Sequence, residues 1–221
     1  MVGKFVISLD FELHWGVSDI WELEPRKAYF DATRRSFPHV LSLFNSFEVH
    51  ATWATVGFLF AKDKEQLLRF SPIEKPTYVN TRLSTYPLID AIGQDESSDP
   101  YHYGHSLIEM ILSCKNQELA THTFSHYYCR EQGQTSAQFE ADLKSVQAIA
   151  MENFGLEMKS LVFPRNQFNA DYLSIAARNG IVTARSNPDQ WFWKGDKPHM
   201  RLARLADTFM NIGHKSPQMH K

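Results

Sequence analysis

The stretch that decides the fold is Phe5-Val6-Ile7-Ser8-Leu9-Asp10-Phe11-Glu12, a short apolar run that ends in acidic residues. β-branched and aromatic residues in such a run predict a buried strand, which we expect over 4–10. Working outward, runs of the same kind alternate with segments of helical spacing. The predicted strands are 50–60, 118–121, 160–163 and 181–185, and the predicted helices are 26–47, 105–114, 135–155 and 170–179. This alternation predicts an α/β fold with a parallel sheet or barrel.

Composition limits the kind of partner that the protein can have. The chain has 221 residues, of which 43% are hydrophobic, and a formal net charge of -2. This charge supplies no broad attraction to nucleic acid or to an anionic membrane. No apolar stretch approaches the roughly 20 residues that span a bilayer. With two cysteines and no leader before the first strand, we expect a reduced, cytoplasmic protein.

One long segment interrupts the alternation of strands and helices. From about 71 to 104 the sequence contains prolines at 72, 76, 87 and 100 and an acidic run at 95–99. Loops of this length inside a compact domain are usually functional or disordered. We therefore expect a single catalytic domain over 1–221 with a long irregular insertion at about 71–104.

The first polar cluster follows the first predicted strand. Because side chains alternate along a strand, Asp10 and Glu12 are expected to point to one face and Phe11 to the other. Two carboxylates that converge in this way need a cation, a shared proton or another partner. The alternative is a solvated turn with capping carboxylates.

The second cluster is Glu118-Leu119-Ala120-Thr121-His122-Thr123-Phe124-Ser125-His126. On one helical turn, His122 and His126 would lie on the same side, which is a common beginning of a zinc, cobalt or iron site. With a carboxylate added, the set would leave open positions for water and substrate, as a hydrolytic metal requires. The alternative is a chance pair on a solvated face.

The third cluster, Leu161-Val162-Phe163-Pro164-Arg165-Asn166-Gln167-Phe168, also follows a predicted strand. Pro164 stiffens the turn, and Arg165 presents a planar fork that suits a carboxylate. An arginine beside a general-base aspartate keeps it ionised and oriented. The alternative is a surface arginine on a loop.

In this order and spacing, the three clusters resemble the motifs of the polysaccharide deacetylases, carbohydrate esterase family four, whose shared domain is named after a nodulation deacetylase. The likeness runs from Phe5 to about Arg185. It implies a distorted (β/α) barrel, expected here to be incomplete at its C-terminal end. It also implies one divalent metal ion, zinc or else cobalt, iron or nickel, and removal of N-acetyl groups from carbohydrates.

The resemblance assigns roles to individual residues. Asp10 corresponds to the catalytic base, His122 and His126 to the metal-binding histidines, and Arg165 to the arginine that steadies the base. The commonest family pattern has two adjacent aspartates, and here Phe11 stands at the second position. Strand alternation makes Glu12 the third metal ligand instead.

Other parts of the site are less fully specified by the sequence. We expect Trp15 and Asn166 to contact the substrate, although core packing is an alternative for Trp15. The family's C-terminal catalytic histidine is either His214 or lies beyond Lys221. For Cys129, three residues after His126, a buried inert thiol is preferred over an approach to the metal.

Three functions remain open at this point. The first is a deacetylase that acts on an N-acetylated polysaccharide, oligosaccharide or glycan precursor. The second is a hydrolase of a small non-sugar amide or ureide, with the segment at 71–103 closing over the ligand. The third is a metal-free binding relative that has lost catalysis.

Overall fold

The computed structural model describes residues 6–187, 190–193 and 197–210. These residues belong to two compact units, one formed by Val6–Arg185 and the other containing the described residues from Ser186 onward. Each unit is described separately below. The single catalytic domain over 1–221 stays a prediction.

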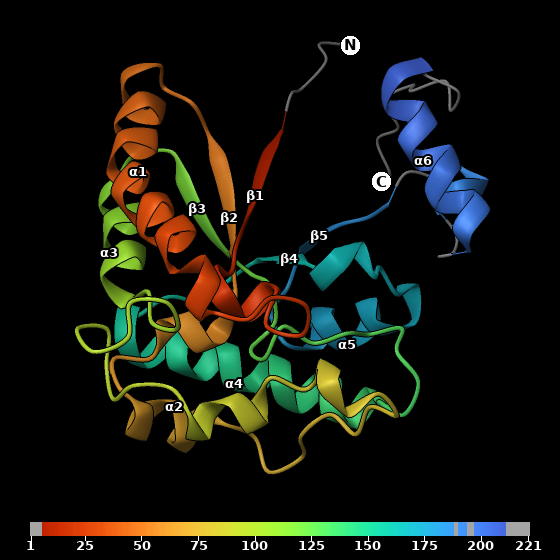
Figure 1. The fold of residues 1–221 in the computed structure, drawn as a ribbon, viewed down its shortest axis with the longest axis horizontal. Helices are drawn as coiled ribbons and strands as arrows, with labels where there is room; N and C mark the ends of the chain where they lie inside the picture. The colour runs from red at the N-terminus through yellow and green to blue at the C-terminus, as the bar shows by residue number, and fades with distance from the viewer. Residues whose placement is uncertain (1–5, 188–189, 194–196, 211–221) are drawn as a thin grey trace. The chain divides into compact units, whose positions relative to one another are not determined.

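The larger unit is built on a sheet of five parallel strands (Figure 1). Its strands are β1 (Ile7–Phe11), β2 (Ala51–Thr55), β3 (Gln117–Thr121), β4 (Ser160–Val162) and β5 (Thr183–Arg185). They lie side by side in the order in which they occur along the chain. Sequential parallel strands joined by helices are the topology of a (β/α) barrel, whereas a doubly wound sheet reverses its strand order. The fold is thus α/β, with a sheet of the barrel type.

The second strand is shorter than the sequence suggested. It ends at Thr55, and a 3₁₀ turn, Gly57–Phe60, takes the place of its predicted second half. The backbone N–H groups of Gly57 and Phe58 donate to the carbonyls of Thr123 and Phe124, at 2.8 and 3.0 Å. A Cβ on Gly57 would lie 2.6 Å from the Cα of Phe124. The chain bends here, and its backbone supports the segment that carries the two histidines.

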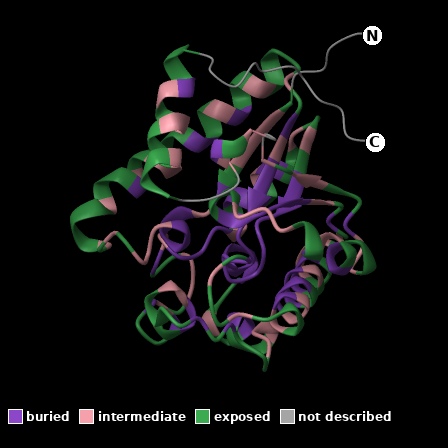
Figure 2. Ribbon diagram, turned by 90° about the vertical axis from the view of Figure 1, so that its right-hand side faces the viewer, coloured by how far each residue is buried: buried purple, intermediate pink, exposed green. Residues whose placement is uncertain are grey.

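Five helices accompany the sheet: α1 (Lys27–Ser46), α2 (Lys64–Phe70), α3 (His105–Ser113), α4 (Ser136–Phe154) and α5 (Leu173–Arg178). Helix α1 continues through Pro38. Helix α4 begins with a capping box between Thr135 and Gln138 and ends at Gly155 in the left-handed conformation, close to the predicted range of 135–155. Figure 2 shows the buried residues gathered on the strands and on the sides of the helices that face them.

The segment between α2 and α3 is largely irregular, as predicted. Its helical parts are two short 3₁₀ turns, Thr81–Leu83 and Tyr86–Asp90. Its end is tied to α1, because Nη1 of Arg34 donates to the carbonyls of Pro100 and Tyr103 at 3.1 and 3.0 Å. This part of the insertion is therefore fixed to the sheet's helical layer.

The second unit contains a 3₁₀ turn, Trp191–Trp193, and helix α6 (Pro198–Met210). Arg204 connects them, since its guanidinium donates to the carbonyl of Phe192 at 2.6 Å and lies over the ring of Trp193. Among the described residues, no helix combines the length and apolarity needed to cross a membrane.

Candidate metal centre

Three side chains from distant parts of the chain meet at the carboxyl ends of β1 and β3. Glu12, His122 and His126 each offer one ligand atom, and these atoms lie within 4.8 Å of one another. Oε2 of Glu12 is 3.0 Å from Nε2 of His126 and 3.4 Å from Nε2 of His122. The structure thus brings together the two histidines and the carboxylate that the sequence proposed as metal ligands.

Glu12 is held where β1 ends and a 3₁₀ turn, Leu13–Gly16, begins. Leu13 adopts a positive φ of 44°, which is uncommon for a residue with a side chain. The carboxylate of Glu12 lies directly against Gly16, where a Cβ would come within 2.0 Å of its carboxyl carbon. Gly16 therefore provides the space that Glu12 occupies.

The histidines do not lie on a helical turn, contrary to the expectation from their spacing. Residues 122–126 form an irregular loop in which Thr123 and His126 have positive φ angles of 66° and 58°. The loop is fixed by a buried carboxylate, Asp142 of α4. Asp142 accepts hydrogen bonds from the N–H groups of Phe124 and Ser125, at 2.6 and 3.1 Å, and from the Ser125 hydroxyl at 2.5 Å.

Asp142 is a supporting residue that the sequence reasoning missed. A signal was present, because position 142 falls on the apolar stripe of α4 that includes Phe139, Leu143 and Val146. A carboxylate on a buried helical face needs a specific partner. Burial raises the pKa of Asp142 to about 6, and the hydrogen bonds from the loop offset only part of that effect.

The hydrogen atoms on the two histidine rings can be placed by their partners. Nδ1 of His122 lies 2.9 Å from the carbonyl of Val162, which can only accept, so this nitrogen carries the hydrogen. In the neutral ring, Nε2 then presents a lone pair toward Glu12. Nδ1 of His126 meets the hydroxyl of Tyr128 at 3.0 Å, which allows the same arrangement.

The residues present fit a divalent cation. Nε2 of His122 and Nε2 of His126 are buried and have no hydrogen-bond partner, while a carboxylate oxygen faces both. Burial lowers the pKa of His126, which favours the neutral, ligating form. Two imidazoles and one carboxylate are a donor set of hydrolytic zinc sites.

Asp10 is paired with an arginine other than the one expected. Arg185, at the end of β5, contacts both carboxylate oxygens of Asp10, with Nη1 3.0 Å from Oδ1 and Nη2 3.1 Å from Oδ2. The same guanidinium donates to the Ser8 hydroxyl and to Oδ1 of Asn166. The expected contact between Arg165 and Asp10 is not formed.

Arg165 is directed elsewhere by its backbone. Both Arg165 and Asn166 have positive φ angles, of 50° and 53°. The guanidinium of Arg165 pairs with Asp19 and lies 5.0 Å from the ring centroid of Tyr128. Arg165 thereby packs on the residue whose hydroxyl contacts His126.

The remaining residues proposed from the sequence have different positions. Trp15 is 0% exposed and its indole N–H donates to the carbonyl of His102 at 2.8 Å, so it belongs to the core and not to a substrate surface. Asn166 is exposed beside Arg185. Cys129 is buried, and burial raises its pKa, as for an inert thiol. His214 lies outside the described residues.

A small pocket opens beside the two carboxylates. It has a volume of about 190 Å³, and Asp10 and Glu12 contribute to its lining. Its other walls come from the end of β1, the loop after it and the first turns of α1: Phe11, Leu13, Val17, Trp21, Tyr29, Phe30 and Thr33. The candidate base and the candidate metal ligand therefore border one space with mixed polar and apolar walls.

Comparisons with solved structures give distant matches. The CE4 family pseudoenzyme BA3943 of Bacillus anthracis is 16% identical, with 92% of this chain and 50% of that chain covered and a TM-score of 0.47. The peptidoglycan deacetylase PdaC of Bacillus subtilis is 14% identical, with coverages of 91% and 68% and a TM-score of 0.42. The BpsB deacetylase domain of Bordetella bronchiseptica is 14% identical, with coverages of 84% and 64% and a TM-score of 0.47. The chain spans about half the length of the first of these.

A sequence comparison gives the family. No curated protein matches the chain. The family model described as polysaccharide deacetylase matches residues 28–184, which include His122, His126 and Arg165 and leave Asp10 and Glu12 outside. Since the match covers well over half of the 221 residues, the chain belongs to the polysaccharide deacetylase family.

Proposed function

We propose that this protein is a metal-dependent hydrolase that removes N-acetyl groups from a carbohydrate. The observation that carries the proposal is the convergence of Glu12, His122 and His126, with two buried ring nitrogens that lack a hydrogen-bond partner. Family membership supports a carbohydrate as the substrate. Zinc is the proposed ion because its usual protein ligands match this set.

Each residue of the site has a proposed task. Glu12, His122 and His126 would hold the ion, which when bound would acidify a water molecule and polarise the acyl carbonyl. Asp10 takes a proton from the attacking water, as a general base. Arg185 fixes the plane of the Asp10 carboxylate through two hydrogen bonds, so that one geometry is presented to the water.

The surroundings of the site support an acyl substrate. The pocket lined by Asp10 and Glu12 has both polar and apolar walls and a volume of about 190 Å³, which suits a small group more than a whole sugar chain. A carbohydrate would then remain outside this pocket while its acetyl group reaches the carboxylates.

Metal analysis combined with acetate release tests the proposal. The purified protein is stripped with a chelator, reconstituted with zinc, cobalt or nickel, and assayed on N-acetylated oligosaccharides and nucleotide sugars. We expect one equivalent of metal and acetate release that is lost on chelation and restored on reconstitution. If the protein hydrolyses only small amides or ureides, its substrate is a small molecule and not a carbohydrate. A protein that binds no metal and releases no acetate would contradict the proposal.

A further inference from the structure

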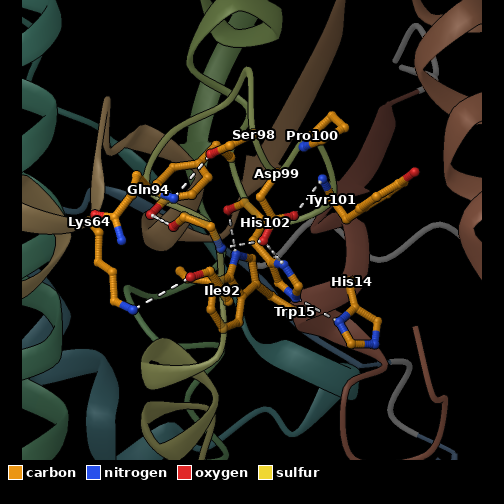
Figure 3. Close-up of polar contacts among 12 residues, drawn as sticks. His14, Trp15, Lys64, Ile92, Gln94, Ser98, Asp99, Pro100, Tyr101 and His102 are labelled. Carbon is orange, nitrogen blue, oxygen red and sulfur yellow. Dashed lines mark hydrogen bonds and ion pairs between the residues drawn. The ribbon is translucent and has the colours of Figure 1, made fainter. Parts of the chain in front are cut away.

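A buried chain of polar side chains runs through His14, His102 and Asp99 (Figure 3). His14 follows Glu12 by two residues. Nε2 of His14 is 3.0 Å from the carbonyl of Trp21, and Nδ1 of His14 is 2.8 Å from Nε2 of His102. Nδ1 of His102 is in turn 2.8 Å from the carboxylate of Asp99. His14 and His102 are each 3% exposed and Asp99 is 8% exposed, so the chain is shielded from solvent.

Both ends of this chain are fixed acceptors. The Trp21 carbonyl at one end can only accept, and the carboxylate of Asp99 accepts from Nδ1 of His102 at the other end. The two imidazole rings are therefore held between partners on both sides. Buried polar networks of this kind are rigid and specify one arrangement.

The same segments are joined by further bonds. The backbone N–H of His14 donates to the carbonyl of Tyr101 at 3.3 Å, and the indole of Trp15 donates to the carbonyl of His102 at 2.8 Å. Asp99 also accepts from the N–H groups of Gly93 and Tyr101. Residues 99–102, at the end of the irregular insertion, therefore bond to the backbone of His14 and to the side chains of His14 and Trp15. These bonds are called the clamp below.

Residues 14 and 15, which these bonds hold, are in turn connected to the proposed metal ligand Glu12. The N–H of Trp15 donates to the carbonyl of Glu12 at 3.1 Å, and the Glu12 carboxylate lies against Gly16. Leu13, between Glu12 and His14, has a φ of 44°. A conformation of this kind costs free energy and persists only where its surroundings determine it. The bonds to residues 99–102 hold the turn after Leu13 from one side, and the guanidinium of Arg165, which donates to the carbonyl of Gly16 at 3.5 Å, holds it from another segment.

We infer that His102 is a positioning residue for the metal centre, which holds Glu12 in its ligating place through His14 and Trp15. This inference rests on the proposed function, because it assigns a supporting residue to Glu12, one of the three proposed metal ligands. It makes the end of the insertion a structural support of the metal centre and not a lid over it.

Cobalt binding to the chelator-stripped protein tests the inference without substrate. The variants are His102→Leu, which removes both side-chain bonds, and Trp15→Phe, which removes one bond of the clamp. The matched control is Tyr103→Phe, because the Tyr103 hydroxyl donates to the carbonyl of Gly93 at 3.0 Å in the same segment but does not contact the Glu12 turn. Glu12→Gln supplies the visible cobalt spectrum of a site without its carboxylate. Thermal unfolding is recorded for each variant.

For His102→Leu we expect cobalt affinity to fall about tenfold, the lower end of the range for outer partners of metal ligands. Its spectrum should move toward that of Glu12→Gln, and Trp15→Phe should change in the same direction, while Tyr103→Phe matches the wild type. Wild-type affinity and spectrum in folded His102→Leu would overturn the inference. If His102→Leu does not fold, equal cobalt affinities of Trp15→Phe and Tyr103→Phe would overturn it. Failure of the unmodified protein to bind cobalt would instead contradict the proposed function.

Discussion

Arg185 holds both carboxylate oxygens of Asp10, with N–O distances of 3.0 and 3.1 Å. The guanidinium is itself anchored by Ser8 and Asn166, from the first strand and from the turn after β4. A two-bond contact of this type fixes the direction of the carboxylate as well as its position. It places an arginine beside the proposed base although Arg165 is turned away toward Asp19.

Replacing Arg185 by methionine should lower kcat while leaving the metal in place. Without the two bonds the Asp10 carboxylate can rotate, and misplacement of a catalytic group by about 1 Å can cost about a hundredfold in rate. Steady-state kinetics and metal content on the same sample measure this effect. Arg165→Met serves as the comparison. If it reproduced the loss of kcat while Arg185→Met did not, the assignment of Arg185 to the base would be contradicted.

Substitutions of Asp10 and of His126 should have different effects on metal content. Asp10→Asn removes the general base, whose contribution is typically about 10²–10⁴-fold, and should keep the metal because Asp10 is outside the ligand set. His126→Ala removes a ligand and should lose the metal itself. Metal content per chain and the rate of acetate release distinguish the two variants. Near-normal turnover in Asp10→Asn would rule out the assigned base.

Gly16→Ala should displace Glu12. The added Cβ would lie 2.0 Å from the carboxyl carbon, so the side chain has to move away from the histidines. We expect weaker metal binding, by about ten- to a hundredfold as for a disturbed support of a ligand, measured by titration of the stripped protein. The control is Gly104→Ala, whose Cβ would meet its nearest atom at 3.4 Å. Equal affinities for the two variants would show that Glu12 does not ligate from this position.

Asp142 should give stability a specific dependence on pH. Burial raises the pKa of its carboxyl from 3.8 to about 6, so the folded state binds the proton more tightly than the unfolded chain does. The free energy of unfolding from this group is therefore highest below about pH 4 and is lost as pH rises through 6. With 1.36 kcal/mol per pKa unit, the loss is roughly 3 kcal/mol.

Comparison with Asp142→Asn isolates this contribution, because the amide does not titrate. Denaturant unfolding between pH 4 and 7 should show the stability of the wild type falling relative to the variant. A difference that stays constant over this range would mean that the carboxyl is not held at a raised pKa.

The sequence predicted those parts of the fold that follow from local patterns. Apolar runs identified the five strands of the sheet, and the helix predicted over 135–155 agrees with α4 to within one residue at each end. Strand alternation and the four-residue spacing selected Glu12, His122 and His126, which the structure brings together. The strands and the ends of α4 were predictable because each depends on residues close together in the chain.

Contacts between side chains far apart in the sequence could not be predicted from such local patterns. The partner of Asp10 is 175 residues away, and no local feature distinguishes Arg185 from Arg165 as that partner. The conformation of the histidine loop depends on Asp142 in the following helix, so the spacing alone suggested a helical turn that does not form. For Trp15 the sequence allows either a substrate contact or core packing, and the hydrogen bond of its indole to the insertion places it in the core.

The most direct test of the account is anomalous diffraction from crystals of the protein grown with zinc and recorded on both sides of the zinc absorption edge. We expect one strong peak about 2.0–2.2 Å from a carboxylate oxygen of Glu12 and from the Nε2 atoms of His122 and His126. A map with no peak among these three atoms, or with the ion held by other residues, would contradict the claim that they form the metal centre.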